Sequence, residues 1–118
     1  MDRTTDNFTG HATNPGFVAK HIKANGQVIP VTPKDGKYFS YEELTAFVGG
    51  YIEMVRPPSK TGAVIICNED GKAEGLPRNE LATKMWQEHA EPGSMRMADH
   101  IVGDILLCHE SQMEKDEE

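Results

Sequence analysis

The longest apolar run of the chain extends from Ala63 to Cys67, and its length sets the first limit on the fold. A membrane-spanning helix needs about 20 apolar residues, so this run is far too short to cross a bilayer. Short apolar runs of this kind are typical of a strand that is buried on both faces of a sheet. We therefore predict a strand over Ala63–Asn68 at the centre of a sheet, and no membrane segment.

Turn signals divide the rest of the chain into short segments. Asn25-Gly26 is the strongest type of short hairpin signal, and it predicts strands over 17–24 and 27–32 on its two sides. Pro30 has no N–H to donate to a neighbouring strand, so the second of these strands is expected at an edge of the sheet. The remaining strands are predicted over two further segments, 51–55 and 101–108.

Capping signals predict two short helices. Ser40 and Glu43 form a capping box, in which each side chain accepts a hydrogen bond from the backbone N–H of the other residue. Gly49-Gly50 ends this helix, because glycine adopts the left-handed conformation without strain. A second helix is predicted over 79–89 with its apolar face formed by Leu81 and Met85, and further by Trp86 and Ala82. The fold class is α+β, with a mostly antiparallel sheet of about five strands and two short helices.

The length of 118 residues suits one domain between two polar ends. Residues 1–15 contain one aromatic residue, Phe8, and no Val, Ile or Leu, so we predict a flexible N-terminal arm. Residues 16–109 form the single α+β domain. Residues 110–118 carry five acidic side chains and one lysine, which indicates an acidic C-terminal tail.

Charge and cysteine content limit the partners. The net charge of −7 argues against binding to nucleic-acid backbones, which requires a basic face, and is compatible with a basic protein partner. It still allows a small anionic ligand held by a few Lys or Arg side chains. The opening residues 1–6 are polar and lack the apolar core of a signal peptide, so we expect a cytoplasmic protein. Cys67 and Cys108 belong to no C-x-x-C pair and are interpreted as core residues.

No pattern in the sequence supports catalysis, a metal or a cofactor. The five histidines include no pair at i, i+4 and no H-E-x-x-H motif, so no metal site is predicted. Ser40 and Ser94 lack the surroundings of a nucleophile. Glu53, Asp99 and Asp104 would form a carboxylate group only if their strands are neighbours. We therefore expect a protein that is not an enzyme.

Three short segments are candidates for ligand binding, and each has a purely structural alternative. Arg78 and Asn79 open the second helix, where free N–H groups favour an anion and Arg78 would hold a phosphate; alternatively, Asn79 only caps the helix. Gly50 and Tyr51 would admit a ligand beside the backbone, or would only link the helix to a strand. Arg56 and Lys60 flank Pro57-Pro58 and would hold a phosphate, or are ordinary surface charges.

Four ordered segments resemble a known family. They are FVGGYIE at 47–53, NEDGK at 68–72, LPRNELAT at 76–83 and IVGDIL at 101–106. Together they are similar to the domain-of-unknown-function family 3846, small proteins often encoded by phages and other mobile elements, and the resemblance covers residues 17–108. It implies a phage-type context and no mechanism; by analogy with other small acidic phage proteins, we expect a role against a host system. Small phage proteins of this kind include oligomers that trap nucleotide signals and mimics of DNA.

Two hypotheses of function follow. The first is a non-enzymatic binding module for a small anionic ligand, a nucleotide or cyclic nucleotide, which sequesters a host immune signal and is built as a homo-oligomer. The second is an acidic protein-interaction inhibitor or DNA mimic that acts on a host enzyme. Its carboxylates would replace phosphates, and they come from Glu42, Glu43, Glu80 and the C-terminal tail.

Overall fold

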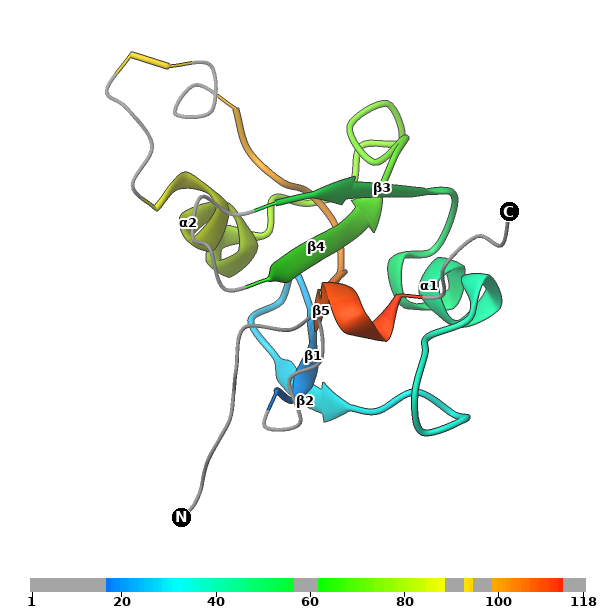
Figure 1. Ribbon diagram of the computed structural model, residues 1–118. Helices are drawn as coiled ribbons and strands as arrows, with labels where there is room; N and C mark the ends of the chain where they lie inside the picture. The colour runs from blue at the N-terminus through cyan, green and yellow to red at the C-terminus, as the bar shows by residue number, and fades with distance from the viewer. Residues whose placement is uncertain (1–16, 57–61, 89–92, 95–98, 114–118) are drawn as a thin grey trace.

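The computed structural model describes residues 17–56, 62–88, 93–94 and 99–113. Within these ranges, five strands form one antiparallel sheet in the order β2-β1-β5-β4-β3, and two helices pack on it (Figure 1). The strands are β1 (Ala19–Ile22), β2 (Val28–Val31), β3 (Ile52–Val55), β4 (Ala63–Asn68) and β5 (Ile105–His109). The helices are α1 (Tyr41–Val48) and α2 (Glu80–Gln87), and a 3-10 turn, η1 (Glu110–Gln112), follows β5. The predicted α+β class, with a mostly antiparallel sheet and two short helices, is confirmed.

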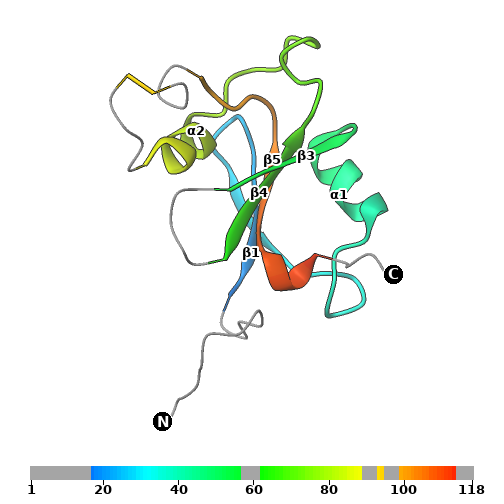
Figure 2. The same ribbon diagram turned by 45° about the horizontal axis from the view of Figure 1, so that its top comes forward.

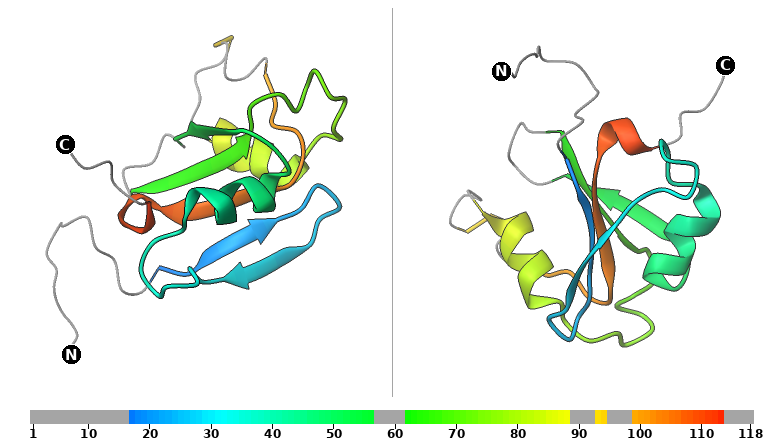
Figure 3. Two further views of the ribbon diagram at one scale, coloured as in Figure 1. Left: turned by 90° about the vertical axis from the view of Figure 1, so that its right-hand side faces the viewer. Right: turned by 90° about the horizontal axis from the view of Figure 1, so that it is seen from below.

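The helices lie on opposite faces of the sheet (Figure 2 and the right view of Figure 3). Side chains alternate along a strand, so each inner strand supplies both cores. On the α1 face the buried cluster consists of Ala19, Phe39, Leu44, Val48, Val64, Ile66, Leu106 and Cys108. On the α2 face it consists of Ile22, Ile65, Cys67, Ala82, Ile101 and Ile105. The two free cysteines therefore belong to different cores, as expected for thiols that act as small apolar residues.

The position of β4 corrects one prediction. Its residues from Val64 onward are buried, as the apolar run predicted, but the central strand of the sheet is β5, and β4 lies between β5 and β3. A strand is buried on both faces when it has a neighbouring strand on each side and a helix over each face. Besides β5, the strands β1 and β4 also have a neighbouring strand on each side. The sequence pattern therefore identified an inner strand and placed it wrongly at the centre.

The capping signals of α1 are confirmed. The Ser40 hydroxyl accepts from the Glu43 N–H at 3.1 Å, and the Glu43 carboxylate accepts from the Ser40 N–H at 2.8 Å. Gly49 has a φ of 81° and donates its N–H to the Thr45 carbonyl at 2.7 Å, so it ends the helix in the left-handed conformation. Leu44 and Val48 are the buried residues of this helix.

Helix α2 is turned differently from the prediction. Its buried residues are Ala82 and Thr83, whereas Leu81 is 39% exposed, so the expectation that Leu81 faces the core is wrong. The Thr83 hydroxyl donates to the Ile101 carbonyl and accepts from the Ile101 N–H, and this pair of bonds fixes which side of the helix faces inward. Met85 and Trp86 pack against the core as expected. His89, the predicted end, lies outside the described residues.

The C-terminal boundary also differs from the prediction. The structure places η1 directly after β5, and Met113 packs against the α1-side core. The Phe39 N–H donates to the Gln112 carbonyl at 2.8 Å, which ties this segment to the entry of α1. The fold therefore extends to Met113, beyond the predicted domain end at residue 109. No helix in the described part of the chain is long and apolar enough to cross a membrane.

Candidate functional site

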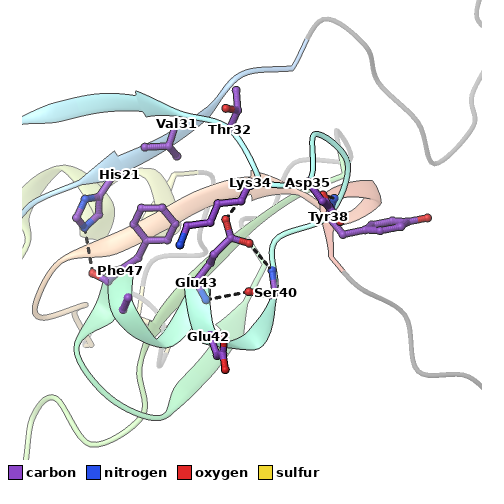
Figure 4. A pocket seen from close by; sticks show the side chains of 11 residues that line it. His21, Val31, Thr32, Lys34, Asp35, Tyr38, Ser40, Glu42, Glu43 and Phe47 are labelled. Atoms are coloured by element: carbon purple, nitrogen blue, oxygen red, sulfur yellow. Dashed lines mark hydrogen bonds between the residues drawn. The ribbon is translucent and has the colours of Figure 1, made fainter.

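A groove of about 740 Å³ lies beside α1, over the part of the sheet that the helix leaves uncovered (Figure 4). Helix α1 lies mainly over β3, β4 and β5. The groove is beside the helix, on the same face of the sheet, and the β1–β2 hairpin lines it. His21 of β1 and Val31 of β2 point to this face, and the loop after β2 closes one end with Lys34 and Asp35. The size is within the range of about 300–1,000 Å³ that is usual for ligand sites.

The apolar wall of the groove is centred on Phe47 of α1. The ring centroids of Phe47 and His21 are 4.9 Å apart, and the His21 Nε2 lies 3.0 Å from the Phe47 carbonyl oxygen. Since a carbonyl only accepts, Nε2 carries the proton and donates, which leaves Nδ1 as the second polar atom of the ring. Val31 and Ala46 extend the wall. The groove therefore joins an aromatic and aliphatic surface to a single imidazole.

The polar side of the groove begins with Glu43. Its carboxylate accepts from the Ser40 N–H through one oxygen and from the Lys34 N–H, at 2.9 Å, through the other. These backbone hydrogen bonds, that from Ser40 foremost, lower the pKa of the Glu43 carboxyl below its ordinary value. Glu43 is therefore ionised at neutral pH, and it joins the loop after β2 to the start of α1.

Asp35 forms the end of the groove in a similar way. Its carboxylate accepts from the backbone N–H groups of Lys37, at 2.7 Å, and Tyr38, at 2.8 Å, in an Asx turn. These two bonds, that from Lys37 first, lower the pKa of Asp35. Two carboxylates at the rim are thus held in the charged form by the backbone that positions them.

The sum of charges in the groove is negative. Asp35, Glu42 and Glu43 contribute three carboxylates, and Lys34 contributes the one ammonium group among the lining residues. These side chains lie at an exposed rim, so their attraction for an opposite charge is modest and is screened by salt. The groove therefore favours a ligand that combines a positive charge with an apolar part, and disfavours a phosphate.

At the start of α2, where an anion site was predicted, the side chain of Asn79 is already hydrogen-bonded to groups of the protein. Asn79 is 1% exposed; its Nδ2 donates to the carbonyls of Ile22 and Gly103, and its Oδ1 accepts from the Ala82 N–H. The side chain has no polar atom left for a ligand, so the capping interpretation holds. Arg78 is partly exposed and forms an ion pair with Glu80 at 3.2 Å.

The other candidate residues that the structure describes lie around β3 and are not among the residues that line the cavity with Arg78. Tyr51 is 66% exposed before β3, and Arg56 follows the opposite end of that strand, where it forms an ion pair with Glu110 at 3.0 Å. A Cβ on Gly50 would lie 2.9 Å from the Asn68 Nδ2, so the glycine makes room for that side chain. Lys60 lies outside the described residues.

A smaller cavity of about 180 Å³ lies near α2 and receives two of the three predicted carboxylates. Glu53 and Asp99 line it, whereas Asp104 accepts from the Ala24 N–H instead. Asp99 forms an ion pair with Lys72, which lowers the pKa of the Asp99 carboxyl. Within the described ranges, no group of three or more His, Cys, Asp or Glu side chains has the geometry of a metal site.

Cys67 also lines this smaller cavity, and its surroundings make it a poor nucleophile. Burial, and then the nearby Glu53 carboxylate, raise the pKa of the thiol to about 11. Burial raises the pKa of Cys108, on the other face, to about 12. The reactive form of cysteine is the thiolate, so both groups stay unreactive at neutral pH.

One comparison with known proteins gives a result. A family model described as a domain of unknown function, DUF3846, matches residues 15–118. The chain belongs to the DUF3846 family. The match includes every described element and confirms the resemblance that the sequence segments indicated. No curated protein and no solved structure matches this DUF3846 chain.

The groove was missed in the sequence because its parts are far apart in the chain. His21 and Phe47 meet only after the hairpin and the helix have packed; His21 belongs to no motif, and the segment 47–53 that begins with Phe47 gives no sign of its partner. A partial signal was present in the acidic side chains around the helix start, Asp35, Glu42 and Glu43. Two of these, Glu42 and Glu43, were among the carboxylates of the acidic-interaction hypothesis.

Proposed function

We propose that this chain is a non-enzymatic binding module whose groove beside α1 holds a positively charged, partly apolar segment of a partner protein. The observation that carries the proposal is the composition of the groove, three carboxylates and one ammonium group around the Phe47 wall. The overall charge of −7 attracts such a partner from a distance. The proposal develops the acidic protein-interaction hypothesis. The phage-type resemblance supports a host enzyme in the cytoplasm as the partner.

The alternative, a small anionic ligand, has one favourable observation. Arg78 and Lys84 both line a cavity of about 420 Å³ beside α2. Glu80 lines the same cavity and pairs with Arg78, so a phosphate would have to displace a carboxylate. If a nucleotide binds there, Arg78→Ala should weaken it by about one to two orders of magnitude, since a charge-assisted hydrogen bond is worth roughly 1.5–3 kcal/mol. The groove beside α1 gives no comparable support.

Two single substitutions separate the hypotheses by the sign of their effects. Glu42→Gln removes a carboxylate of the groove; the side chain forms no hydrogen bond or ion pair within the part of the chain that the structure describes. Lys34→Gln removes the ammonium group and keeps the backbone N–H that bonds to Glu43. For a basic segment, Glu42→Gln should weaken binding and Lys34→Gln should tighten it, each by roughly two- to fivefold.

The measurement is titration calorimetry with an array of capped peptides in which one Lys or Arg is flanked by aliphatic residues. Affinity should decrease when salt is raised, because exposed charges are screened. Glu69→Gln, which changes the net charge equally but lies away from the groove, is the matched control and should leave the affinity nearly unchanged. The proposal fails if no peptide binds, or if Lys34→Gln weakens the peptides that do.

A further inference from the structure

The two edges of the sheet offer different backbone groups to a further strand. In an antiparallel pair, every second residue turns its N–H and C=O away from the neighbouring strand. The Lys23 N–H donates to the Gln27 carbonyl at 2.8 Å, which fixes the alternation in the β1–β2 hairpin. Val28 and Pro30 are then the outward residues of β2. Pro30 has no N–H, so this edge cannot complete a ladder.

The β3 edge has no such block. The Glu69 N–H donates to the Tyr51 carbonyl at 2.8 Å, so Tyr51, Glu53 and Val55 turn toward β4. Ile52 and Met54 are therefore the outward residues, and each presents both an N–H and a C=O. Among the residues that the structure describes, these groups have no hydrogen-bond partner. The edge is thus a short, complete template for another strand.

The surroundings of β3 favour a second copy of the chain over a strongly basic partner. Glu53 and Arg56 give this edge one charge of each sign, in contrast to the acidic groove. Met54 is 44% exposed and Tyr51 is 66% exposed, which leaves apolar surface to cover beside the open backbone. A strand that pairs with its own copy about a two-fold axis satisfies each outward N–H with an outward C=O of the other.

We propose that β3 pairs antiparallel with β3 of a second copy, with Met54 on the two-fold axis. Pairing centred on Glu53 would place two carboxylates directly opposite each other, which destabilises a sheet. Pairing centred on Ile52 would need Gly50 in the ladder, although its N–H turns back to the Thr45 carbonyl at the end of α1. Pairing centred on Met54 sets Glu53 opposite Val55 and Ile52 opposite Arg56, and avoids both problems.

This interface is separate from the groove, so the two proposals succeed or fail independently. Their salt dependence also differs. Two copies with a net charge of −7 repel each other, so the dimer should become tighter as salt is raised, whereas the groove should lose its basic peptide.

The test is sedimentation combined with residue-resolved amide hydrogen exchange at low and high protein concentration. The amides of Ile52 and Met54 should become protected only at high concentration. The amides of Glu53 and Val55, which face β4, should be protected at both, and that of Val28 at neither. A chain that stays monomeric at all concentrations, or a dimer that protects Val28 instead, would overturn the proposal.

Variants at Met54 test the register. Met54→Pro removes the outward N–H at a position equivalent to that of Pro30, which β2 already tolerates, and should weaken the dimer by roughly tenfold or more. Met54→Ala, which keeps the N–H, is the matched control and should retain the dimer. If Met54→Pro does not fold, Met54→Glu places two carboxylates at the axis and should also weaken the dimer. Unchanged dimerisation of a folded Met54→Pro or Met54→Glu variant would contradict the pairing.

Discussion

The two faces of the sheet are covered by helices of equal length that are held in different ways. Helix α2 is fixed by polar side chains inside the core, since Asn79 and Thr83 are each 1% exposed and fully hydrogen-bonded to backbone. Helix α1 begins at a partly exposed capping box of Ser40 and Glu43, and one buried polar side chain, Asn68, donates to the Val48 carbonyl at its end at 3.3 Å. The buried polar contacts set one orientation for α2, whereas the groove lies beside α1.

This difference explains why the candidate site lies beside α1. Glu43 is at once a capping residue, a link to the Lys34 loop and a charge in the groove. The structure of the groove rim and the stability of α1 therefore depend on the same side chain. On the α2 face, the corresponding residue, Asn79, has all its polar atoms engaged and serves the fold alone.

The largest expected effect is that of Asn79→Ala. The substitution removes three interior hydrogen bonds, which the Asn79 side chain makes with the Ile22 carbonyl, the Gly103 carbonyl and the Ala82 N–H. A buried group that is left short of a partner costs about 1–3 kcal/mol. We expect the free energy of unfolding to fall by roughly 3 kcal/mol or more, measured by urea denaturation. A loss below about 1 kcal/mol would show that water replaces these bonds and would remove the contrast between the helices.

A smaller effect is expected for the equivalent change in α1. Ser40→Ala removes one cap hydrogen bond at a partly exposed helix start, which costs about 1 kcal/mol. The same urea denaturation measures it. A loss as large as that of Asn79→Ala would mean that the surface cap of α1 matters as much as the buried cap of α2.

The smallest effect concerns pH. The folded-state pKa of Glu43 is lowered, so its contribution to stability is complete above the unfolded value of about 4.3 and is lost as pH falls through the folded value. The free energy of unfolding should therefore decrease as pH is lowered below about 4.3. In Glu43→Gln this decrease in the free energy of unfolding at low pH should be smaller, by about 1 kcal/mol or less. If the free energy of unfolding decreases equally with pH in both proteins, Glu43 is excluded as a source of the pH dependence.

Signals that act over a few residues predicted most of the fold. The capping box, the glycine after α1, the Asn25-Gly26 turn and the edge position of Pro30 each depend on neighbours in sequence, and each is found in the structure. The strand order was not predictable in this way, because the pairing of β5 with β1 and β4 joins segments that are distant along the chain. The burial of Leu81 was mistaken because the Thr83 hydroxyl, and not apolar periodicity, orients α2.

The candidate site was less predictable than the fold. A basic residue at a helix start was a reasonable indication of an anion site, but Glu80, two residues after Arg78, already neutralises it. The groove forms only where His21, Phe47 and the loop with Lys34 come into contact, and no local sequence pattern predicts contacts between segments so far apart. Only the acidic character of the helix start was visible in the sequence.

The most direct test of the central claim is to map where a basic peptide binds by NMR chemical-shift changes. The peptide from the array that binds most tightly is titrated into labelled protein at low salt. We predict the largest shifts at His21, Val31 and Phe47, with little change around Arg78 and Lys84. Shifts that cluster on α2, or shifts produced there by a nucleotide and by no peptide, would contradict the assignment of the groove beside α1 as the binding site.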